Sequence, residues 1–133
     1  MTRFQIALMV GIFAASAGLA QDIDCANPQV QLELTFCAQK DWKIADEDLN
    51  DAYGAAQAVM KAIDADLPAD ETGAVTNLRD GQRAWIVYRD AACAAEGYLY
   101  HGGSIEPMIV AYCLARVTQT RAQDIWLLSQ QGE

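Results

Sequence analysis

The feature that most restricts the fold of this chain is a long row of apolar residues at helical spacing in its first half. Steps of one, three or four residues separate Trp42, Ala45, Leu49, Ala52, Tyr53, Ala56, Val59, Met60 and Ile63. Such steps place the side chains on one face of a single continuous helix. The helix is expected to begin soon after Asn27-Pro28, because Asn caps a helix and Pro suits its first turn. The acidic stretch 64–73, which contains Pro68, is expected to form a loop.

Two further helices are predicted. The second should run from Thr72 or Ala74 to near Tyr98, and its inner face carries Val75, Leu78, Gln82, Trp85, Arg89 and Ala92. A turn at Gly102-Gly103-Ser104 follows, and Ser104 with Pro107 indicates the start of the third helix. That helix should end near Gln130, and its inner face carries Met108, Tyr112, Ala115, Ala122 and Ile125. Three helices joined by short loops predict an all-α, antiparallel three-helix bundle with up-down-up order.

The first residues predict export. Arg3 gives a positive start, and the apolar run from Phe4 to Ala20 ends in the small residues Gly18-Leu19-Ala20. This pattern is typical of a Sec-type signal peptide that covers residues 1–20 and is cleaved after Ala20. Four residues separate Ala20 from Cys25, so the first cysteine is not placed for lipidation. We therefore expect residues 21–133 to form a single periplasmic or secreted domain without a membrane anchor.

The four cysteines of an exported chain predict two disulfides. They are Cys25, Cys37, Cys93 and Cys113. A zinc site is disfavoured, because no two of them lie two to four residues apart. If the first hairpin turns near residue 68, residues of the first and second helices lie at the same height along the bundle when their numbers sum to about 136. If the second hairpin turns near residue 102, the corresponding sum for the second and third helices is about 204. We call these pairs of positions the hairpin levels. They favour Cys93–Cys113, with Cys25–Cys37 as the other bond, although both crossed pairings stay open.

The acidity of the chain restricts its partners. The formal net charge is −9. Loss of Arg3 with the signal peptide leaves eight basic against eighteen acidic residues, a net charge of about −10. Such a charge opposes nucleic-acid binding, which needs clusters of Lys and Arg. It favours fast, salt-sensitive association with basic proteins, although acidity also serves solubility alone.

Several polar residues interrupt the apolar faces of the predicted helices. They are Asp46, Asn50, Tyr53, Arg79, Gln82, Arg83, Arg89, Thr118 and Arg121. The hairpin levels place Asp46 beside Arg89 or Asp90, and Tyr53 and Arg121 beside Arg83. Because a buried charge without its partner is costly, we expect these residues to form one interior network that fixes the register of the helices. Arg89 also lies one turn from Trp85, on which its planar group can stack.

A catalytic or ligand-binding cluster is the competing interpretation of these polar residues. No obvious nucleophile or base accompanies them, and the lone His101 has no Cys or Ser partner nearby. The acidic stretch 64–71 lacks the Gly and Glu that a calcium-binding EF-hand loop requires, since Ala69 and Val75 occupy those positions. We therefore predict no catalytic residues, no metal site and no cofactor.

Three stretches of the chain carry a resemblance to a known family. The first is Ala45 to Tyr53, the second and most specific is Leu78 to Cys93, and the third begins at Gly102-Gly103-Ser104. The third continues with Met108, Cys113, Thr118 and Arg121. Together they resemble the N-terminal domain of the LprI lysozyme-inhibitor family, over about residues 25–128. The resemblance implies an exported bacterial helical domain, with inhibition of lysozyme as the named activity of the family.

The turn between the second and third helices is the most suitable contact region for a protein partner. It contains Tyr98, Leu99, Tyr100, His101, Gly102, Gly103 and Ser104. Two tyrosines beside a conformationally permissive glycine pair suit an exposed recognition loop. The same residues also suit a helix end that is packed by its tyrosines, with glycines that serve the turn only.

The leading hypothesis is a periplasmic or secreted binding protein that inhibits lysozyme-type enzymes through an acidic surface. The alternative is a structural or interaction module of the cell envelope with no enzyme target. The sequence leaves the oligomeric state open.

Overall fold

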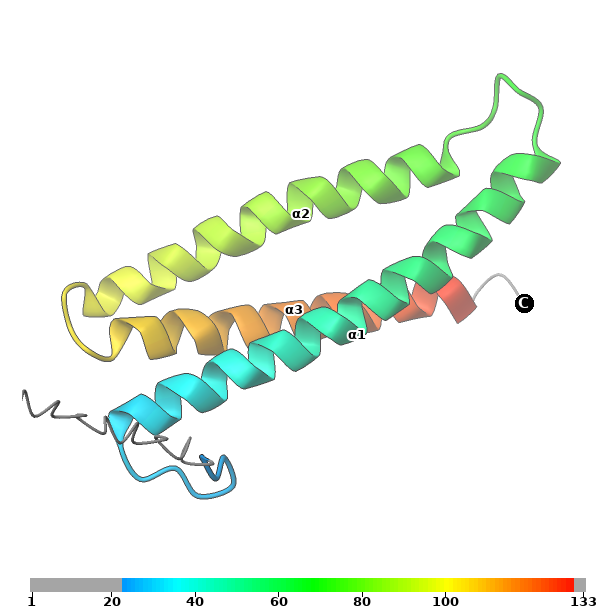
Figure 1. The fold of residues 1–133 in the computed structure, drawn as a ribbon. Coiled ribbons are helices and arrows are strands. Elements are labelled where there is room, and N and C mark those ends of the chain that lie inside the picture. The colour runs from blue at the N-terminus through cyan, green and yellow to red at the C-terminus, as the bar shows by residue number, and fades with distance from the viewer. Residues whose placement is uncertain (1–22, 131–133) are drawn as a thin grey trace, which may run out of the picture.

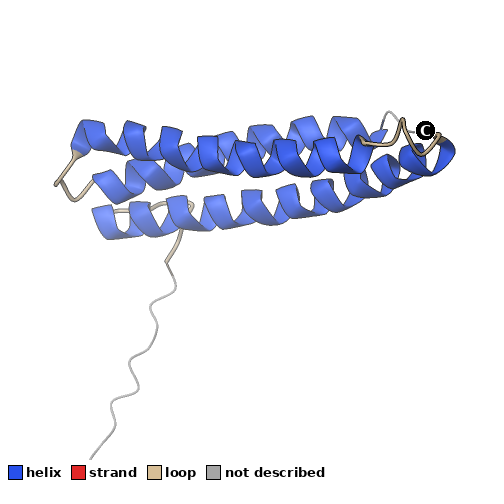
Figure 2. Cartoon of the chain, turned by 90° about the horizontal axis from the view of Figure 1, so that it is seen from above, coloured by secondary structure: helices blue, strands red, loops and turns tan. Residues whose placement is uncertain are grey.

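Three long helices make up the described part of the chain. The computed structural model describes residues 23–130, so the predicted signal peptide (1–20) lies outside them. The helices are α1 (Gln31–Asp66), α2 (Ala74–Gly97) and α3 (Glu106–Gln130), and a short 3-10 turn, η1 (Tyr98–Tyr100), follows α2. Residues 23–130 contain no strand, and short loops join the helices (Figure 2). The predicted all-α bundle is confirmed, and no helix in this range is both long and apolar enough to cross a membrane.

The three helices follow up-down-up order. In Figure 1, α2 returns antiparallel to α1, and α3 then runs parallel to α1 and close beside it. The α1–α3 contact is lined by small side chains: Ala38, Ala45, Ala52 and Ala56 on α1, and Ala111, Thr118 and Ala122 on α3. Small residues let two helices approach closely, and Leu49 and Ile125 fill the space between them. The core is therefore mainly the interface of α1 and α3.

One residue expected in this interface is not there. Tyr112 was predicted to face inward, but its side chain is 42% exposed. Ala111 and Cys113 on either side of Tyr112 are buried instead, together with Leu114. Met108, Ala122 and Ile125 are buried as predicted, whereas Ala111 takes the place expected for Tyr112, because the narrow contact with α1 requires a smaller residue.

The second helix is attached by fewer buried groups. Leu78, Arg89, Cys93 and Gly97 are its buried residues. Leu78 packs into the cluster around Ala122 and Ile125, and Gly97 lies against Val110 of α3. A disulfide joins Cys93 to Cys113 with a Cα–Cα distance of 5.4 Å, and so links α2 directly to α3.

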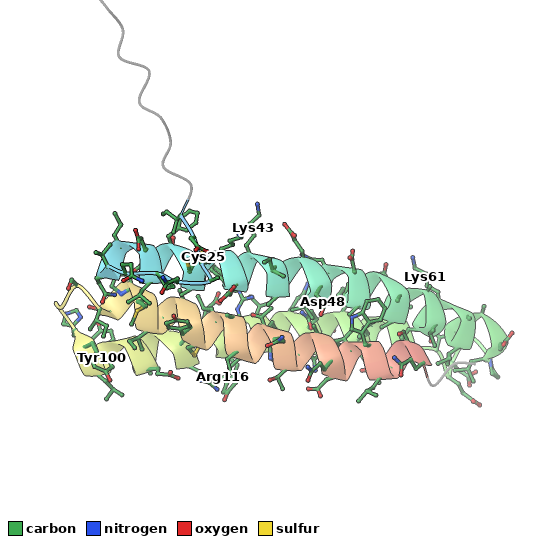
Figure 3. All side chains as sticks on the ribbon, turned by 90° about the horizontal axis from the view of Figure 1, so that it is seen from below. Cys25, Lys43, Asp48, Lys61, Tyr100 and Arg116 are labelled. Carbon is green, nitrogen blue, oxygen red and sulfur yellow. A yellow bond between two sulfur atoms is a disulfide. The ribbon has the colours of Figure 1, made fainter. Side chains whose placement is uncertain are left out.

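The other disulfide joins Cys25 to Cys37, with a Cα–Cα distance of 5.5 Å. It holds the segment before α1 against the second turn of that helix (Figure 3). Both bonds are the favoured ones: the hairpin levels predicted Cys93–Cys113, and Cys25–Cys37 was the remaining pair. Both lie towards the end of the bundle where α1 begins and α2 ends.

Helix α1 starts later than predicted. It begins at Gln31, and not soon after Asn27-Pro28. The side-chain carbonyl oxygen of Asn27 accepts a hydrogen bond from Gln29 Nε2 at 2.7 Å, so Asn27 does not cap a helix. The Glu33 carboxylate takes over this function, because it accepts the backbone N–H groups of Gln29 at 2.6 Å and Val30 at 3.4 Å.

Helix α1 also ends later than predicted, and this brings Asp64 into the helix. The Asp64 carboxylate reaches across the loop and accepts the backbone N–H groups of Gly73 (2.8 Å), Ala74 (2.8 Å) and Val75 (3.0 Å). These are unsatisfied donors at the start of α2. The donors of Gly73, then Val75 and Ala74, hold the pKa of Asp64 below its ordinary value of 3.8. One carboxylate therefore ends one helix and begins the next.

Gly97 tests the fit of α2 on α3. A Cβ atom added at Gly97 would overlap the Val110 side chain, whose branched Cβ has little freedom to move. We expect Gly97→Ala to lower the free energy of unfolding by about 1–3 kcal/mol in urea titrations. Gly54→Ala is the matched control, because nothing lies within 4 Å of that exposed helical position. It should raise stability by roughly 0.5–1 kcal/mol, and equal effects at both positions would contradict the close α2–α3 contact.

Asp64 predicts a defined dependence of stability on pH. Because folding lowers its pKa, its contribution is complete above the unfolded value near 3.8 and is lost as the pH falls through the folded value. Asp64→Asn should lower the Tm by on the order of 5 °C at neutral pH. The difference from wild type should narrow as the pH falls below about 4 in thermal melts followed by circular dichroism. Asp70→Asn, an exposed change in the same loop, should leave the Tm almost unaltered, and a pH-independent effect of Asp64→Asn would be the contrary result.

Candidate functional site

Arg89 is the buried charge of the molecule's interior. Its side chain is 10% exposed, and Nε donates to Asp90 Oδ1 at 2.8 Å while Nη1 donates to Asp46 Oδ1 at 3.4 Å. The guanidinium carbon lies 5.7 Å from the ring centre of Trp42 and 5.2 Å from that of Trp85. These distances are within the range of cation–π attraction. Arg89 therefore joins α2 to α1 through both charge and packing.

A second polar pair lies further along the bundle. Arg121 Nε of α3 donates to Gln82 Oε1 of α2 at 3.1 Å, and the guanidinium of Arg121 lies 5.9 Å from the Trp85 ring centre. The indole of Trp85 is thus within reach of both Arg89 and Arg121. On α1, Asn50 Nδ2 donates to Asp46 Oδ2 at 3.4 Å. The polar residues form two groups that meet at Trp85.

Four of the predicted network residues do not take part in it. Arg83 is exposed and makes no ion pair or hydrogen bond to any residue between 23 and 130, and Arg79 is exposed and pairs with Asp80. Thr118 is completely buried, but its Oγ1 has no hydrogen-bond partner in the described chain. Tyr53 packs against the apolar cluster around Leu49. The hairpin levels predict the height of a residue along the bundle but not the direction of its side chain. Arg83 is next to Gln82 in the sequence, but its side chain points outward.

The remaining polar groups serve packing between helices. Asp46 and Asp90 take up the charge of Arg89, and Gln82 is occupied by Arg121. Within residues 23–130, no three His, Cys, Asp or Glu side chains gather as a metal site would require. The contacts of Arg89 and Arg121 connect α2 to α1 and to α3.

The turn after α2 carries three exposed large side chains. Tyr98, Leu99 and Tyr100 are 66%, 79% and 45% exposed. The rings of Tyr98 and His101 stack with centres 4.6 Å apart and planes within 5°. We call residues 98–103 the tyrosine turn. These large side chains face solvent. The alternative interpretation, a helix end that is packed by its tyrosines, is therefore wrong.

The tyrosine turn is held in one conformation by Glu106, the first residue of α3. The Glu106 carboxylate accepts the N–H of Gly102 at 2.8 Å and lies 3.2 Å from His101 Nδ1. The Gly102 donor and then the His101 side chain hold the pKa of Glu106 below its ordinary value. Gly102 has a φ of +79°, a conformation that favours glycine. The exposed side chains are therefore displayed by a fixed backbone.

A groove lies on the outer side of the α1–α3 contact. Its volume is about 680 Å³, and it is lined by Asp41, Ile44, Ala45, Asp48, Tyr112, Ala115, Arg116 and Gln119. Ile44 and Tyr112 are the large apolar residues of this lining, and Asp41 and Asp48 are its acidic residues. Figure 3 shows Asp48 near the junction of α1 and α3, while Arg116 at the edge of α3 pairs with Glu96 of α2 at 2.9 Å. The Asp48 carboxylate also accepts a hydrogen bond from Trp126 Nε1 at 2.9 Å.

Comparison with known proteins decides the family. The family model described as "Lysozyme inhibitor LprI" matches residues 24–125, which include both disulfides, the interior network and the tyrosine turn. The chain belongs to the LprI family. An uncharacterized protein of Rhizobium meliloti (strain 1021) is 40% identical over 113 residues, which cover 83% of this LprI-family chain and 81% of the relative. No solved structure matches the chain.

Several residues that shape this LprI-family domain were missed by reasoning from sequence. Trp42 stacks on Arg89, Asp64 caps α2, and Glu106 fixes the tyrosine turn. Only Glu106 had a local signal, since an acid four residues after a glycine at a predicted helix start can reach back to its N–H. Asp64 lies nine residues before its first donor, and no periodicity connects them.

Arg89 is expected to be far more important for stability than Arg83. Arg89→Ala removes the packing between Trp42 and Trp85 and should lower the free energy of unfolding by about 2–4 kcal/mol. Arg89→Lys keeps the charge but loses the planar stacking, so it should also destabilise. Arg83→Ala, on the exposed side of the same helix, should change stability by less than about 0.5 kcal/mol. Similar losses in urea titrations of the two Ala variants would contradict the interior position of Arg89.

Proposed function

We propose that this LprI-family chain is an extracytoplasmic binding protein that inhibits a lysozyme-type enzyme. The observation that carries the proposal is the match of the family model, whose description is a lysozyme inhibitor, to most of the chain. Two disulfides in a domain of this size are typical of oxidising compartments, which supports a periplasmic or secreted location. The predicted signal peptide at residues 1–20 agrees with this location.

The tyrosine turn supplies the anchor of the proposed contact. A few side chains that enter a pocket of the partner usually carry most of the binding energy of an interface, and tyrosine is common among them. Tyr98, Leu99 and Tyr100 are exposed, and the hydrogen bonds of Glu106 hold their backbone in place before binding. A fixed loop loses little conformational freedom when it binds, so more of the contact energy appears as affinity.

Charge supplies the attraction at longer range. The chain carries a formal net charge of −9, and lysozymes are usually basic proteins. The exposed carboxylates of Asp41 and Asp48 flank the groove between α1 and α3, where a basic side chain can meet them while its stem packs on Ile44 and Tyr112. Such attraction accelerates association and is screened by salt.

Inhibition assays with basic lysozymes test this function. The purified protein should slow lysis of bacterial cell walls, and the inhibition constant should rise as salt increases from about 50 to about 300 mM. Leu99→Ala and Tyr98→Ala should each weaken inhibition by about tenfold or more. Leu127→Ala is the matched control, because Leu127 is 55% exposed near the opposite end of the bundle, and it should leave inhibition unaltered.

Two results would contradict the proposal. Failure to bind or inhibit any member of a panel of basic lysozymes would remove the enzyme target and leave the envelope interaction module as the working hypothesis. Equal effects of the Leu99 and Leu127 changes would show that the tyrosine turn is not the anchor.

A further inference from the structure

The outer face of α2 is an apolar surface that the bundle does not use. Six residues of α2 and Tyr98, the first residue of η1, lie three or four positions apart or adjacent and form what we call the outer stripe: Ala84, Val87, Tyr88, Ala91, Ala94, Ala95 and Tyr98. All are exposed, and the large side chains of Val87, Tyr88 and Tyr98 are 71%, 66% and 66% exposed. Arg89 and Cys93 lie on the opposite face of α2, which packs against α1 and α3. Figure 1 shows α2 set apart from the close α1–α3 pair.

The outer stripe contains no charged residue, although the chain as a whole has a net charge of −9. A contiguous, uncharged apolar surface of several helical turns is typical of a protein contact. The stripe shares Tyr98 with the tyrosine turn, but along the rest of its length it offers a basic enzyme no carboxylate. A partner surface that is itself apolar and uncharged fits better, and the chain provides one in a second copy of the same stripe.

We propose that two copies of this protein associate through their outer stripes, with the two α2 helices antiparallel about Ala91. In such a symmetric pair, Ala91 faces Ala91 of the second copy, and facing residues have numbers that sum to 182. Val87 then faces Ala95, Tyr88 faces Ala94, and Tyr98 faces Ala84. Each large side chain therefore meets an alanine of the other copy. A parallel pair would set Tyr88 against Tyr88 and Val87 against Val87, and so lacks this fit.

Two further features of the structure agree with this arrangement. The α1–α3 contact within one copy already packs alanines closely, so the same kind of helix contact is built into the fold. Arg83 is exposed at the edge of the outer stripe without an ion pair among residues 23–130. In the antiparallel pair it is level with Leu99 and next to Tyr98 of the second copy, where its guanidinium can lie over the tyrosine ring.

The size of the stripe sets the expected strength of the dimer. Complete burial of both stripes would cover on the order of 1,000 Å² in total, near the lower limit for a specific interface. We therefore expect a weak, transient dimer, as is typical of interfaces of this size. Repulsion between two copies of net charge −9 opposes association, so added salt should strengthen the dimer. This is opposite to the effect of salt on the proposed complex with a basic enzyme.

Analytical ultracentrifugation of the purified protein tests the dimer without any enzyme target. Wild type should shift from monomer to dimer between roughly 1 and 100 μM, at a lower concentration in about 300 mM salt than in about 50 mM. Ala91→Glu and Ala91→Lys each place like charges face to face and should weaken the dimer at least tenfold. Mixed in equal amounts, these two variants should associate again, because opposite charges then meet at the centre of the contact.

Ala62→Glu is the matched control, since Ala62 is exposed on α1 and far from the outer stripe in sequence, and it should dimerise like wild type. Oxidised Ala91→Cys should form a covalent dimer, whereas Ala95→Cys should not, because it faces Val87. A monomer at all concentrations and salt conditions, or a dimer unaffected by either charged change at Ala91, would overturn the proposal. Circular dichroism confirms that each variant is folded.

Discussion

The close parallel packing of α1 and α3 is the constraint on which the rest of the structure depends. Alanines at steps of four or seven residues along α1 allow this approach, and Ala111, Thr118 and Ala122 complete it from α3. A larger residue at any of these positions would separate the helices. Thr118 is buried in the same narrow contact, and its Oγ1 has no hydrogen-bond partner in residues 23–130. The narrow contact also explains why Tyr112 points to the outer groove.

Carboxylates organise the three chain segments that lead into the helices. Glu33 accepts N–H groups ahead of α1, Asp64 accepts those at the start of α2, and Glu106 accepts the N–H of Gly102 ahead of α3. Backbone N–H groups at a helix start carry partial positive charge, so an acid is the natural partner. Part of the acidity that a simple charge count assigns to the surface is therefore used inside the fold. The remaining acids, such as Asp41, are the ones that face solvent.

Much of this architecture could be predicted from periodicity and loop position. Apolar spacing indicated the three helices, and the hairpin levels placed Asp46 near Arg89 and Cys93 near Cys113. The angular position of a side chain was harder to predict, because neighbours such as Gln82 and Arg83 differ by about 100° around the helix. The long-range capping by Asp64 could not be predicted, since it depends on the path of the loop. For the candidate site, the sequence indicated the tyrosine turn, but its exposure and its support by Glu106 required coordinates.

The uneven attachment of α2 has a consequence for where this protein can exist intact. Besides Leu78 and Gly97, the helix is held by Arg89 and by the covalent link from Cys93 to Cys113. In a compartment rich in thiols that link would open, and α2 would be held only by non-covalent contacts, among them the stacked Arg89 and the pairs Gln82–Arg121 and Glu96–Arg116. Its exposed alanine-rich length would then be open to proteases, while oxidation keeps it closed. The bond thereby ties the lifetime of the domain to the redox state of its surroundings.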